Sequence, residues 1–416
     1  MPSNTLAKTA RSLDGRIDEL ARISDERGMT TRTFLSPAMG RANALVGRWM
    51  KTAGLAVSQD TVGNLVGRVE GPMKTSRTLL LGSHLDTVRD AGSYDGVLGV
   101  LLPLSALEVL RERGVSLPFA VEVLGFSEEE GVRFSSAYLG SKGFTGRLRK
   151  SDLRLRDAKG VSVEQALIDH NGGRFAPPAA AHVRKELIGY VEAHIEQGPV
   201  LEAGGMAAGV VSAIAGQTRA KIIFTGKAGH AGTTPMGLRS DALAGAAAFI
   251  LGVEAHARTR PPLVATVGRA TAHPGAANVI AGSAELTLDV RHPLDAKRNA
   301  AFRALCGMGR KVAKARGLSF AVQVTQDNGA VQCSAELTGL LAQSVRKAQG
   351  KSVALASGAG HDAVVLSALT PVAMLFVRCR DGLSHHPDEH VEAADLEVAL
   401  AVMVDFLTRM AAKASS

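Results

Sequence analysis

The chain has 416 residues, which is long enough for two ordinary domains and a large core. Aromatic residues make up only 4% of it, which argues against base stacking as its main activity. The formal charge of +9 is scattered without a long basic run, so the composition favours a small anionic substrate over nucleic acid.

Cysteine use and the N-terminal sequence indicate a cytoplasmic protein. Cys306, Cys333 and Cys379 are widely spaced and form no CxxC pair, so a disulfide framework is not expected. The N-terminal segment lacks the apolar run of a signal peptide, and no stretch approaches the roughly 18 apolar residues of a membrane span.

The first two hundred residues predict an α/β layer. Apolar residues at helical spacing predict helix in the first fifty residues. A strand at 78–81, a helix at 97–113 and a strand at 119–126 then alternate, which is typical of a largely parallel sheet. Residues 146–187 are polar and predict a connecting stretch with short helices.

The pattern changes from about Ser212. Four strand-like segments and two helices, at 241–258 and 296–316, follow within about 115 residues and predict a compact α+β unit. The earlier pattern then resumes. The predicted fold class is therefore an α/β domain with a mixed sheet, formed by residues 1–212 and 330–416 and interrupted by a smaller α+β domain at 213–329.

The segment GSHLDTVRDAGSYDG, Gly82 to Gly96, follows the first predicted strand. His84 and Asp86 are two residues apart and can share a face, while Asp95 lies beyond a glycine-bearing loop that can fold back. A carboxylate beside an imidazole fixes its tautomer for metal binding. The alternative is an Asp/Gly-rich turn that contains a chance histidine.

Acidic and imidazole side chains also follow the other predicted strands. SEEEGVRF follows the strand at 119–126, and its three glutamates would repel one another in a cleft unless a cation lay between them. Taken alone, this run favours a solvated acidic loop, and the functional reading gains because the two strand ends are expected to lie side by side. His194 and Glu196 repeat the two-residue spacing, and DGLSHHPDEH follows a strand at 372–377. Nitrogen and oxygen ligands without thiolates suit zinc or manganese, and ligands gather at the carboxyl ends of strands in open α/β sheets.

These motifs occur in one order with several others over about residues 10–412: GSHLDTVRDAGSYDG, EEEGVRF, HIEQGPVLE, GHAGTTPMGLRSDAL, ANVIAG, LDVRHP, SGAGHDA and GLSHHPDE. In this the chain resembles the M20-type metallohydrolases, in their hydantoinase/carbamoylase branch. That branch includes allantoate amidohydrolases, N-carbamoyl-L-amino acid hydrolases and β-ureidopropionases.

The resemblance implies two divalent metal ions per subunit, Zn²⁺ or Mn²⁺, with Asp95 bridging them. The implied ligands are His84, Asp95, Glu130, His194 and His385.

The resemblance also implies a catalytic base and a positioning carboxylate. The family has two glutamates before the glycine, and with Gly131 as the anchor Glu129 is the base and Glu128 is the extra residue. Asp86 matches the partner of His84. His386, where the family usually has a smaller polar residue, is an alternative ligand.

The resemblance makes residues 1–212 and 330–416 the catalytic di-metal domain, and residues 213–329 a dimerisation or lid domain. It implies a homodimer in which His230 reaches the partner's active site, although His230 could instead be a turn histidine that caps the following segment. Arg291, whose planar guanidinium suits a substrate carboxylate, leads the implied substrate contacts. The others are Gln197, Gln217, Asn278 and Gly360, of which Gln197, Gln217 and Gly360 could equally serve the structure.

The implied activity is metal-assisted hydrolysis of the carbamoyl C–N bond of a carboxylate-bearing substrate. DTVRDAGSYDGVLGV and LFVRCRDGLSHHPDE look most like allantoate amidohydrolases, which favours allantoate and a role in purine catabolism. N-carbamoyl-L-amino acids and β-ureidopropionate are the alternatives. A non-catalytic binding protein and a peptidase are the other classes considered, and the complete ligand set argues against the first.

Overall fold

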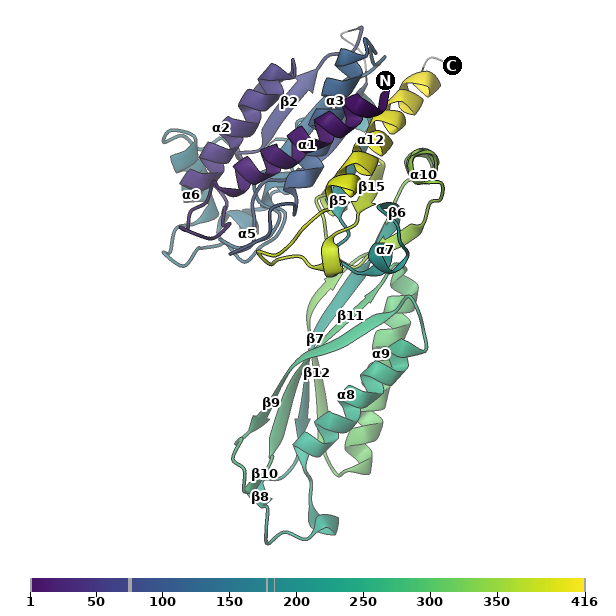
Figure 1. The fold of residues 1–416 in the computed structure, drawn as a ribbon. Helices are drawn as coiled ribbons and strands as arrows, with labels where there is room; N and C mark the ends of the chain where they lie inside the picture. Colours follow the sequence, from purple (N-terminus) through teal and green to yellow (C-terminus); the bar gives the residue numbers. More distant parts are fainter. Residues whose placement is uncertain (1, 74–76, 177–178, 183, 415–416) are drawn as a thin grey trace. The chain divides into compact units, whose positions relative to one another are not determined.

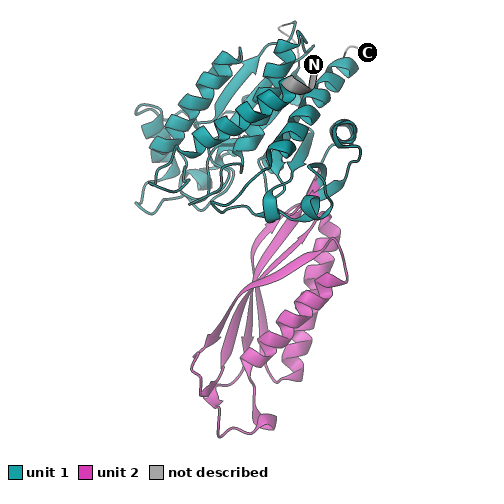
Figure 2. Ribbon diagram, viewed as in Figure 1, with its two compact units in different colours: residues 1–212, 333–355, 359–416 teal, residues 213–332, 356–358 magenta. Residues whose placement is uncertain are grey.

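The computed structural model describes residues 2–73, 77–176, 179–182 and 184–414 (Figure 1). The chain divides into two compact units (Figure 2). The first comprises Met1–Ser212, Cys333–Leu355 and Ala359–Ser416, and the second Ala213–Gln332 and Ala356–Gly358. Among the described residues, no helix has the length and apolar character needed to cross a bilayer.

The larger sheet is parallel in the middle and antiparallel at both edges. Its strand order is β1-β2-β4-β3-β5-β15-β6-β13, and β14 pairs with β6. The neighbours β4, β3, β5 and β15 run parallel, and the flanking pairs are antiparallel. The strands are β1 (Ala56–Gln59), β2 (Leu65–Val69), β3 (Thr78–His84), β4 (Ala120–Phe126), β5 (Leu187–Ile195), β6 (Ala208–Ile214), β13 (Val331–Gln332), β14 (Ala354–Ser357) and β15 (Val372–Val377).

Long helices cover this sheet (Figure 1). Helices α1, α3 and α12 pack against one another, and α10 packs on α12. The long helices of the first unit are α1 (Pro2–Ala21), α2 (Pro37–Thr52), α3 (Val97–Glu112), α10 (Ala335–Gln349) and α12 (Ala393–Ala414). The short ones are α4 (Leu139–Phe144), α5 (Lys150–Leu153), α6 (Val163–His170), η1 (Arg184–Glu186), α7 (Val200–Ala203), α11 (Ala363–Leu366) and η3 (Arg380–Gly382).

Continuous burial explains the apolar runs of the central strands β3 and β15. Every residue of β3, β4 and β15 is buried. A parallel strand covered on both faces needs apolar side chains on both, so it lacks the alternation of a half-exposed strand. The polar side chains of β3 lie at its ends, whereas Glu122 and Glu192 are buried within β4 and β5.

The second unit has a four-stranded antiparallel sheet in the order β12-β7-β11-β9, and helices α8 and α9 pack on it. Its strands alternate buried and less buried residues, because one face carries the helices. The elements are β7 (Gly216–Thr225), β8 (Gly229–His230), η2 (Met236–Leu238), α8 (Ala242–Arg258), β9 (Val264–His273), β10 (Val279–Ile280), β11 (Ser283–His292), α9 (Asp295–Ala315) and β12 (Ser319–Asn328).

The predicted elements are confirmed with small shifts at their ends. The helix expected at 97–113 is α3, and the four strands and two helices of the inserted unit are β7, β9, β11, β12, α8 and α9. The helical N-terminal region is two helices separated by residues 22–36. The short ladder between β8 and β10 was not predicted, because two-residue strands have no periodicity to detect.

Gly82 permits the close pairing of β3 with β4. A Cβ atom at this position would lie 2.2 Å from the main-chain oxygen of Leu124 on the neighbouring strand. We expect G82A to lower the free energy of unfolding by about 1–3 kcal/mol, measured by urea denaturation. G15A makes the same change in α1, where nothing lies within 4 Å, and should be neutral or stabilising. Equal stability of the two variants would contradict this account of the strand pairing.

Candidate metal centre

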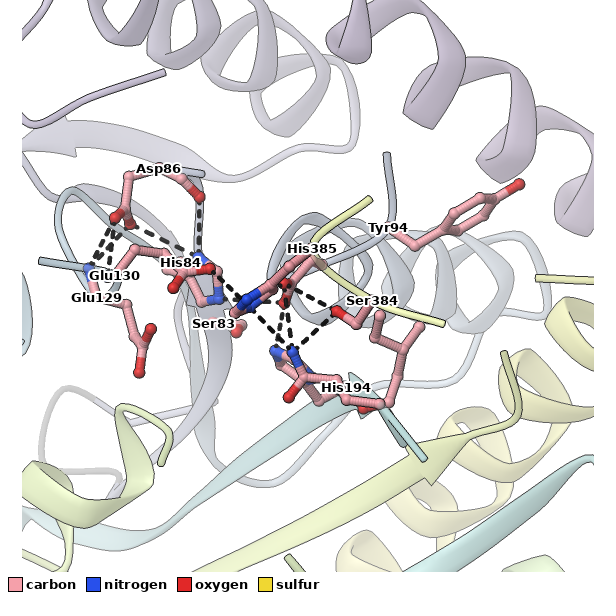
Figure 3. Close-up of polar contacts among 12 residues, drawn as sticks. Ser83, His84, Asp86, Tyr94, Glu129, Glu130, His194, Ser384 and His385 are labelled. Atoms are coloured by element: carbon pink, nitrogen blue, oxygen red, sulfur yellow. Dashed lines mark hydrogen bonds and ion pairs between the residues drawn. The ribbon is translucent and has the colours of Figure 1, made fainter. Parts of the chain in front are cut away.

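The predicted ligands lie at the carboxyl ends of the four parallel strands. His84 is the last residue of β3, and Glu130 follows β4. His194 is the penultimate residue of β5, and His385 lies in the loop after β15. Asp95 directly precedes Gly96, the N-cap of α3. Figure 3 shows the imidazoles of His84, His194 and His385 pointing toward a common centre.

The carboxylate of Asp95 lies between these imidazoles. Its Oδ1 is 3.1 Å from Nε2 of His194 and 3.7 Å from Nε2 of His84. Its Oδ2 is 3.2 Å from Nε2 of His385, which is also 3.4 Å from Oε1 of Glu130. The two oxygens of one carboxylate therefore face two different sets of ligand atoms.

Among the described residues, three groups bring possible ligand atoms within 4.8 Å of one another. They are His84–Asp95–His194, Asp95–Glu130–His385 and His84–Glu129–Glu130. The first two share Asp95, as a bridging carboxylate requires. Oδ1 of Asp95 is buried without a well-formed hydrogen bond, a deficit that a cation would remove. These nitrogen and oxygen donors fit zinc or manganese.

Main-chain oxygens fix the orientation of two of the imidazoles. Nδ1 of His84 donates to the oxygen of Asp86 at 2.9 Å, and Nδ1 of His194 donates to that of Ile195 at 2.9 Å. Because a carbonyl can only accept, each Nδ1 carries a proton, and Nε2 is the nitrogen left to face the centre.

Asp86 lies beside His84 as expected, but the hydrogen bonds of its carboxylate go to the glutamate loop, the segment after β4 that carries Glu129 and Glu130. It accepts hydrogen bonds from the main-chain nitrogen of Glu129 at 2.9 and 3.0 Å and from that of Glu130 at 3.1 Å. Its distance to Nδ1 of His84 is 3.6 Å. Asp86 therefore orients His84 through its main-chain oxygen and holds the main chain of Glu129 and Glu130 through its side chain.

The cluster has a strongly negative environment. Burial acts to raise the pKa of Asp95, but contacts with the His194 and His385 imidazoles hold it well below its usual range. Burial acts to lower the pKa of His194, yet Asp95 raises it to about 9. Hydrogen bonding to Asp95 and Glu130 raises the pKa of His385 to about 10. The carboxylates thus attract positive charge to this place.

Glu129 has a different environment from its neighbour Glu130. Burial, together with the charges of Glu130 and Asp362, holds the pKa of Glu129 well above its ordinary value. A carboxyl group with a raised pKa beside ligand carboxylates is suited to proton transfer.

Sequence reasoning missed two buried glutamates that contact the segments carrying the predicted ligands. Glu389 accepts hydrogen bonds from the main-chain nitrogens of Tyr94 and Asp95 and from the Ser384 hydroxyl. Glu192 accepts from the Ser83 hydroxyl and from the main-chain nitrogen of Ala363. Each had a signal in the sequence: Glu389 lies in the HHPDEH run, and Glu192 lies two residues before His194 on the same strand.

Gln197 and Gly360, two of the implied substrate contacts, lie in the first unit. The amide of Gln197 donates to Ser384 at 3.0 Å and to Oδ2 of Asp95 at 3.3 Å, so it borders the cluster. A Cβ atom at Gly360 would lie 1.9 Å from the Tyr138 hydroxyl, so the packing of Tyr138 favours glycine at this position.

The other implied contacts belong to the second unit. Arg291 donates to both oxygens of Asp289, at 3.0 and 2.9 Å, and Gln217 donates to Asp289 at 2.8 Å. His230 is exposed, and its Nδ1 accepts a hydrogen bond from the main-chain nitrogen of Gly232, as in the turn-capping alternative. Asn278 is exposed on the neighbouring segment.

Three acidic or imidazole residues near the motifs lie outside the described ligand groups. Glu196 instead accepts hydrogen bonds from the main-chain nitrogens at the start of α7. His386 is half exposed and accepts from the main-chain nitrogen of Asp388. Glu128 is fully buried and belongs to none of the three groups found among the described residues.

Comparison with known proteins places this arrangement in a family. The family described as "Peptidase family M20/M25/M40" matches residues 80–409 of this chain. The allantoate deiminase of Arabidopsis thaliana is 40% identical over 94% of this chain and 81% of its own length. The N-carbamoyl-L-amino-acid amidohydrolase of a Pseudomonas strain is 38% identical over 94% of this chain and 96% of its own length.

A solved structure agrees over almost the whole chain. The amidase of the hydantoinase/carbamoylase family from Burkholderia multivorans superposes with a TM-score of 0.91 at 32% identity, covering 97% of this chain and 98% of that one. The chain therefore belongs to peptidase family M20/M25/M40, which confirms the resemblance and the fold class inferred from the sequence.

Gly96 leaves the space that the His84 ring occupies. Its φ is +68°, and a Cβ atom would lie 2.4 Å from atoms of the ring. We expect G96A to displace the ring and to weaken Mn²⁺ binding about tenfold or more, measured by equilibrium dialysis. G114A is the matched control, because Gly114 has a φ of +66° with nothing within 4 Å of the added atom. Equal Mn²⁺ affinity in the two variants would contradict this role.

Proposed function

We propose that this chain is a metal-dependent amidohydrolase that cleaves the carbamoyl C–N bond of allantoate. The observation that carries the proposal is the Asp95 carboxylate, shared between two groups of cation ligands at the carboxyl ends of parallel strands. The names of the relatives support hydrolysis of a linear amide, and allantoate is the substrate named for the relative at 40% identity. N-carbamoyl-L-amino acids are the alternative, from the relative at 38%.

In this proposal the first unit holds two divalent ions, zinc or manganese. His84, Asp95 and His194 would bind one, and Asp95, Glu130 and His385 the other. When bound, such ions lower the pKa of a water molecule and polarise the substrate carbonyl. A urea carbonyl is a weak electrophile because both nitrogens donate electrons into it, so polarisation matters more here than for an ester.

Glu129 would move the proton. Its carboxylate would accept a proton from the attacking water and deliver it to the leaving nitrogen. Asp86 supports this by holding the main-chain nitrogen of Glu129, which fixes the start of the side chain. The environment that raises the pKa of Glu129 also suits the second half of this transfer, in which the carboxyl acts as an acid.

The remaining roles follow the family resemblance. Residues 1–212 and 330–416 would form the catalytic domain, and 213–329 the dimerisation or lid domain of a homodimer. His230 would stabilise negative charge on the carbonyl oxygen in the partner's active site, and Arg291 would bind the substrate carboxylate. Further contacts would come from Gln197, Gln217, Asn278 and Gly360. The enzyme would be cytoplasmic and act in purine catabolism.

A substrate panel tests the function. Allantoate, N-carbamoyl-L-methionine and N-carbamoyl-β-alanine all release ammonia on carbamoyl hydrolysis, so one assay compares their kcat/KM values. We expect the highest value for allantoate, loss of activity with a chelator and recovery with Mn²⁺ or Zn²⁺. A hundredfold preference for a carbamoyl amino acid would reject allantoate. Undiminished turnover after complete metal removal would reject the metal-dependent reaction.

Substitution of the glutamates tests which of them is the base. E129Q keeps the shape but cannot accept the proton, so we expect kcat to fall about 10²–10⁴-fold while the Mn²⁺ content stays that of the wild type. E128Q is the matched control, one residue away, and should retain kcat within severalfold. If E128Q loses activity and E129Q keeps it, the assignment from the Gly131 anchor is wrong.

A further inference from the structure

Glu389 joins two loops that carry ligands of the candidate metal centre. This residue is 4% exposed. Oε1 accepts hydrogen bonds from the main-chain nitrogens of Tyr94 at 2.8 Å and Asp95 at 3.0 Å. Oε2 accepts one from the Ser384 hydroxyl at 3.1 Å. One side chain thus holds the residue before His385 and the main chain of Asp95.

Ser384 extends this connection to the ligand atoms. Its hydroxyl is 3.3 Å from Oδ2 of Asp95 and accepts a hydrogen bond from the amide of Gln197 at 3.0 Å. Oδ2 is the oxygen that faces His385. The contacts of Ser384 therefore lie on the His385 side of the bridging carboxylate.

The two groups of ligands differ in how firmly the fold holds them. His84 and His194 are strand residues whose side chains are 2% exposed. His385 lies in a loop, its side chain is 49% exposed, and its φ is +57°. A non-glycine residue persists in this left-handed region only when its surroundings impose it. Glu389 and Ser384 supply such a restraint.

The Asp95 loop packs tightly on Glu389. A Cβ atom at Gly92 would lie 2.3 Å from Cβ of Glu389 and 2.4 Å from its carboxylate carbon. A larger residue at position 92 would therefore push the glutamate away without removing any polar group.

We propose that Glu389 is a positioning residue that sets the affinity of the cation position formed by Asp95, Glu130 and His385, an inference that rests on the proposed two-ion function. Glu389 binds no ion itself. It fixes the separation of Asp95 and His385, while the position formed by His84, Asp95 and His194 keeps two ligands anchored on strands. Loss of Glu389 therefore weakens binding of the second ion and largely spares that of the first.

The test is a Mn²⁺ titration of the full chain by equilibrium dialysis, which needs no activity. We expect two ions per wild-type chain. In E389A the second ion should bind at least tenfold more weakly, and the first with nearly wild-type affinity. E389Q retains an oxygen for the two main-chain nitrogens, so its affinity for the second ion should lie between those of the wild type and E389A. D241N is the control, because Asp241 also accepts two main-chain N–H bonds, at the start of α8, and it should bind as the wild type does.

A double variant separates positioning from a general structural role. H385A removes a ligand of the second position, so it should retain one ion. If Glu389 acts only through that position, E389A/H385A binds this ion with the affinity of H385A. If Glu389 supports the whole centre, the double variant binds it more weakly, which overturns the proposal. Should E389A not fold, G92A displaces the same side chain and is expected to lose the second ion likewise.

The titration also distinguishes this proposal from the function on which it rests. A wild-type chain that binds fewer than two ions contradicts the two-ion centre, and the role of Glu389 with it. A wild type that binds two ions alongside an E389A variant that binds both with unchanged affinity overturns only the role of Glu389.

Discussion

The burial of several carboxylates at one edge of a sheet is the constraint on which the rest of the structure depends. Asp86, Asp95 and Glu129 are buried, and Glu130 is nearly so. Charges removed from water are costly unless opposite charge or hydrogen bonds compensate them. Main-chain N–H groups compensate Asp86, and imidazoles surround Asp95. The remaining excess of negative charge is what makes this place a candidate cation site.

The parallel strands determine where these groups can meet. Strands β4, β3, β5 and β15 are neighbours, so whatever follows their carboxyl ends lies at one edge. Their interiors are covered on both faces and are largely apolar, and the predicted ligands lie at or after their carboxyl ends. Two glycines permit the close packing at this edge. Gly82 lets β3 approach β4, and Gly96 leaves space for the His84 ring.

The centre combines rigid and adjustable parts. His84 and His194 are fixed by strands and by hydrogen bonds to main-chain oxygens, whereas His385 lies on an exposed loop held from behind by Ser384 and Glu389. A carboxylate also orients Arg291 in the second unit. Asp289 accepts two hydrogen bonds from its guanidinium, which limits the directions in which Arg291 could bind an anion. In both places a buried or partly buried carboxylate orients a group that would act on the substrate or the ions.

The sequence by itself determined the α/β class, the inserted α+β segment from about Ser212, and the residues that leave each strand end. These are local properties: an apolar run predicts a buried strand, and a polar side chain after it is visible in the sequence. Only the tertiary structure decided which atoms meet. The carboxylate of Asp86 holds the glutamate loop rather than His84, and Glu389 binds Asp95 across most of the chain. Such contacts join distant segments whose register depends on how the strands pair, and residue spacing carries no record of that pairing.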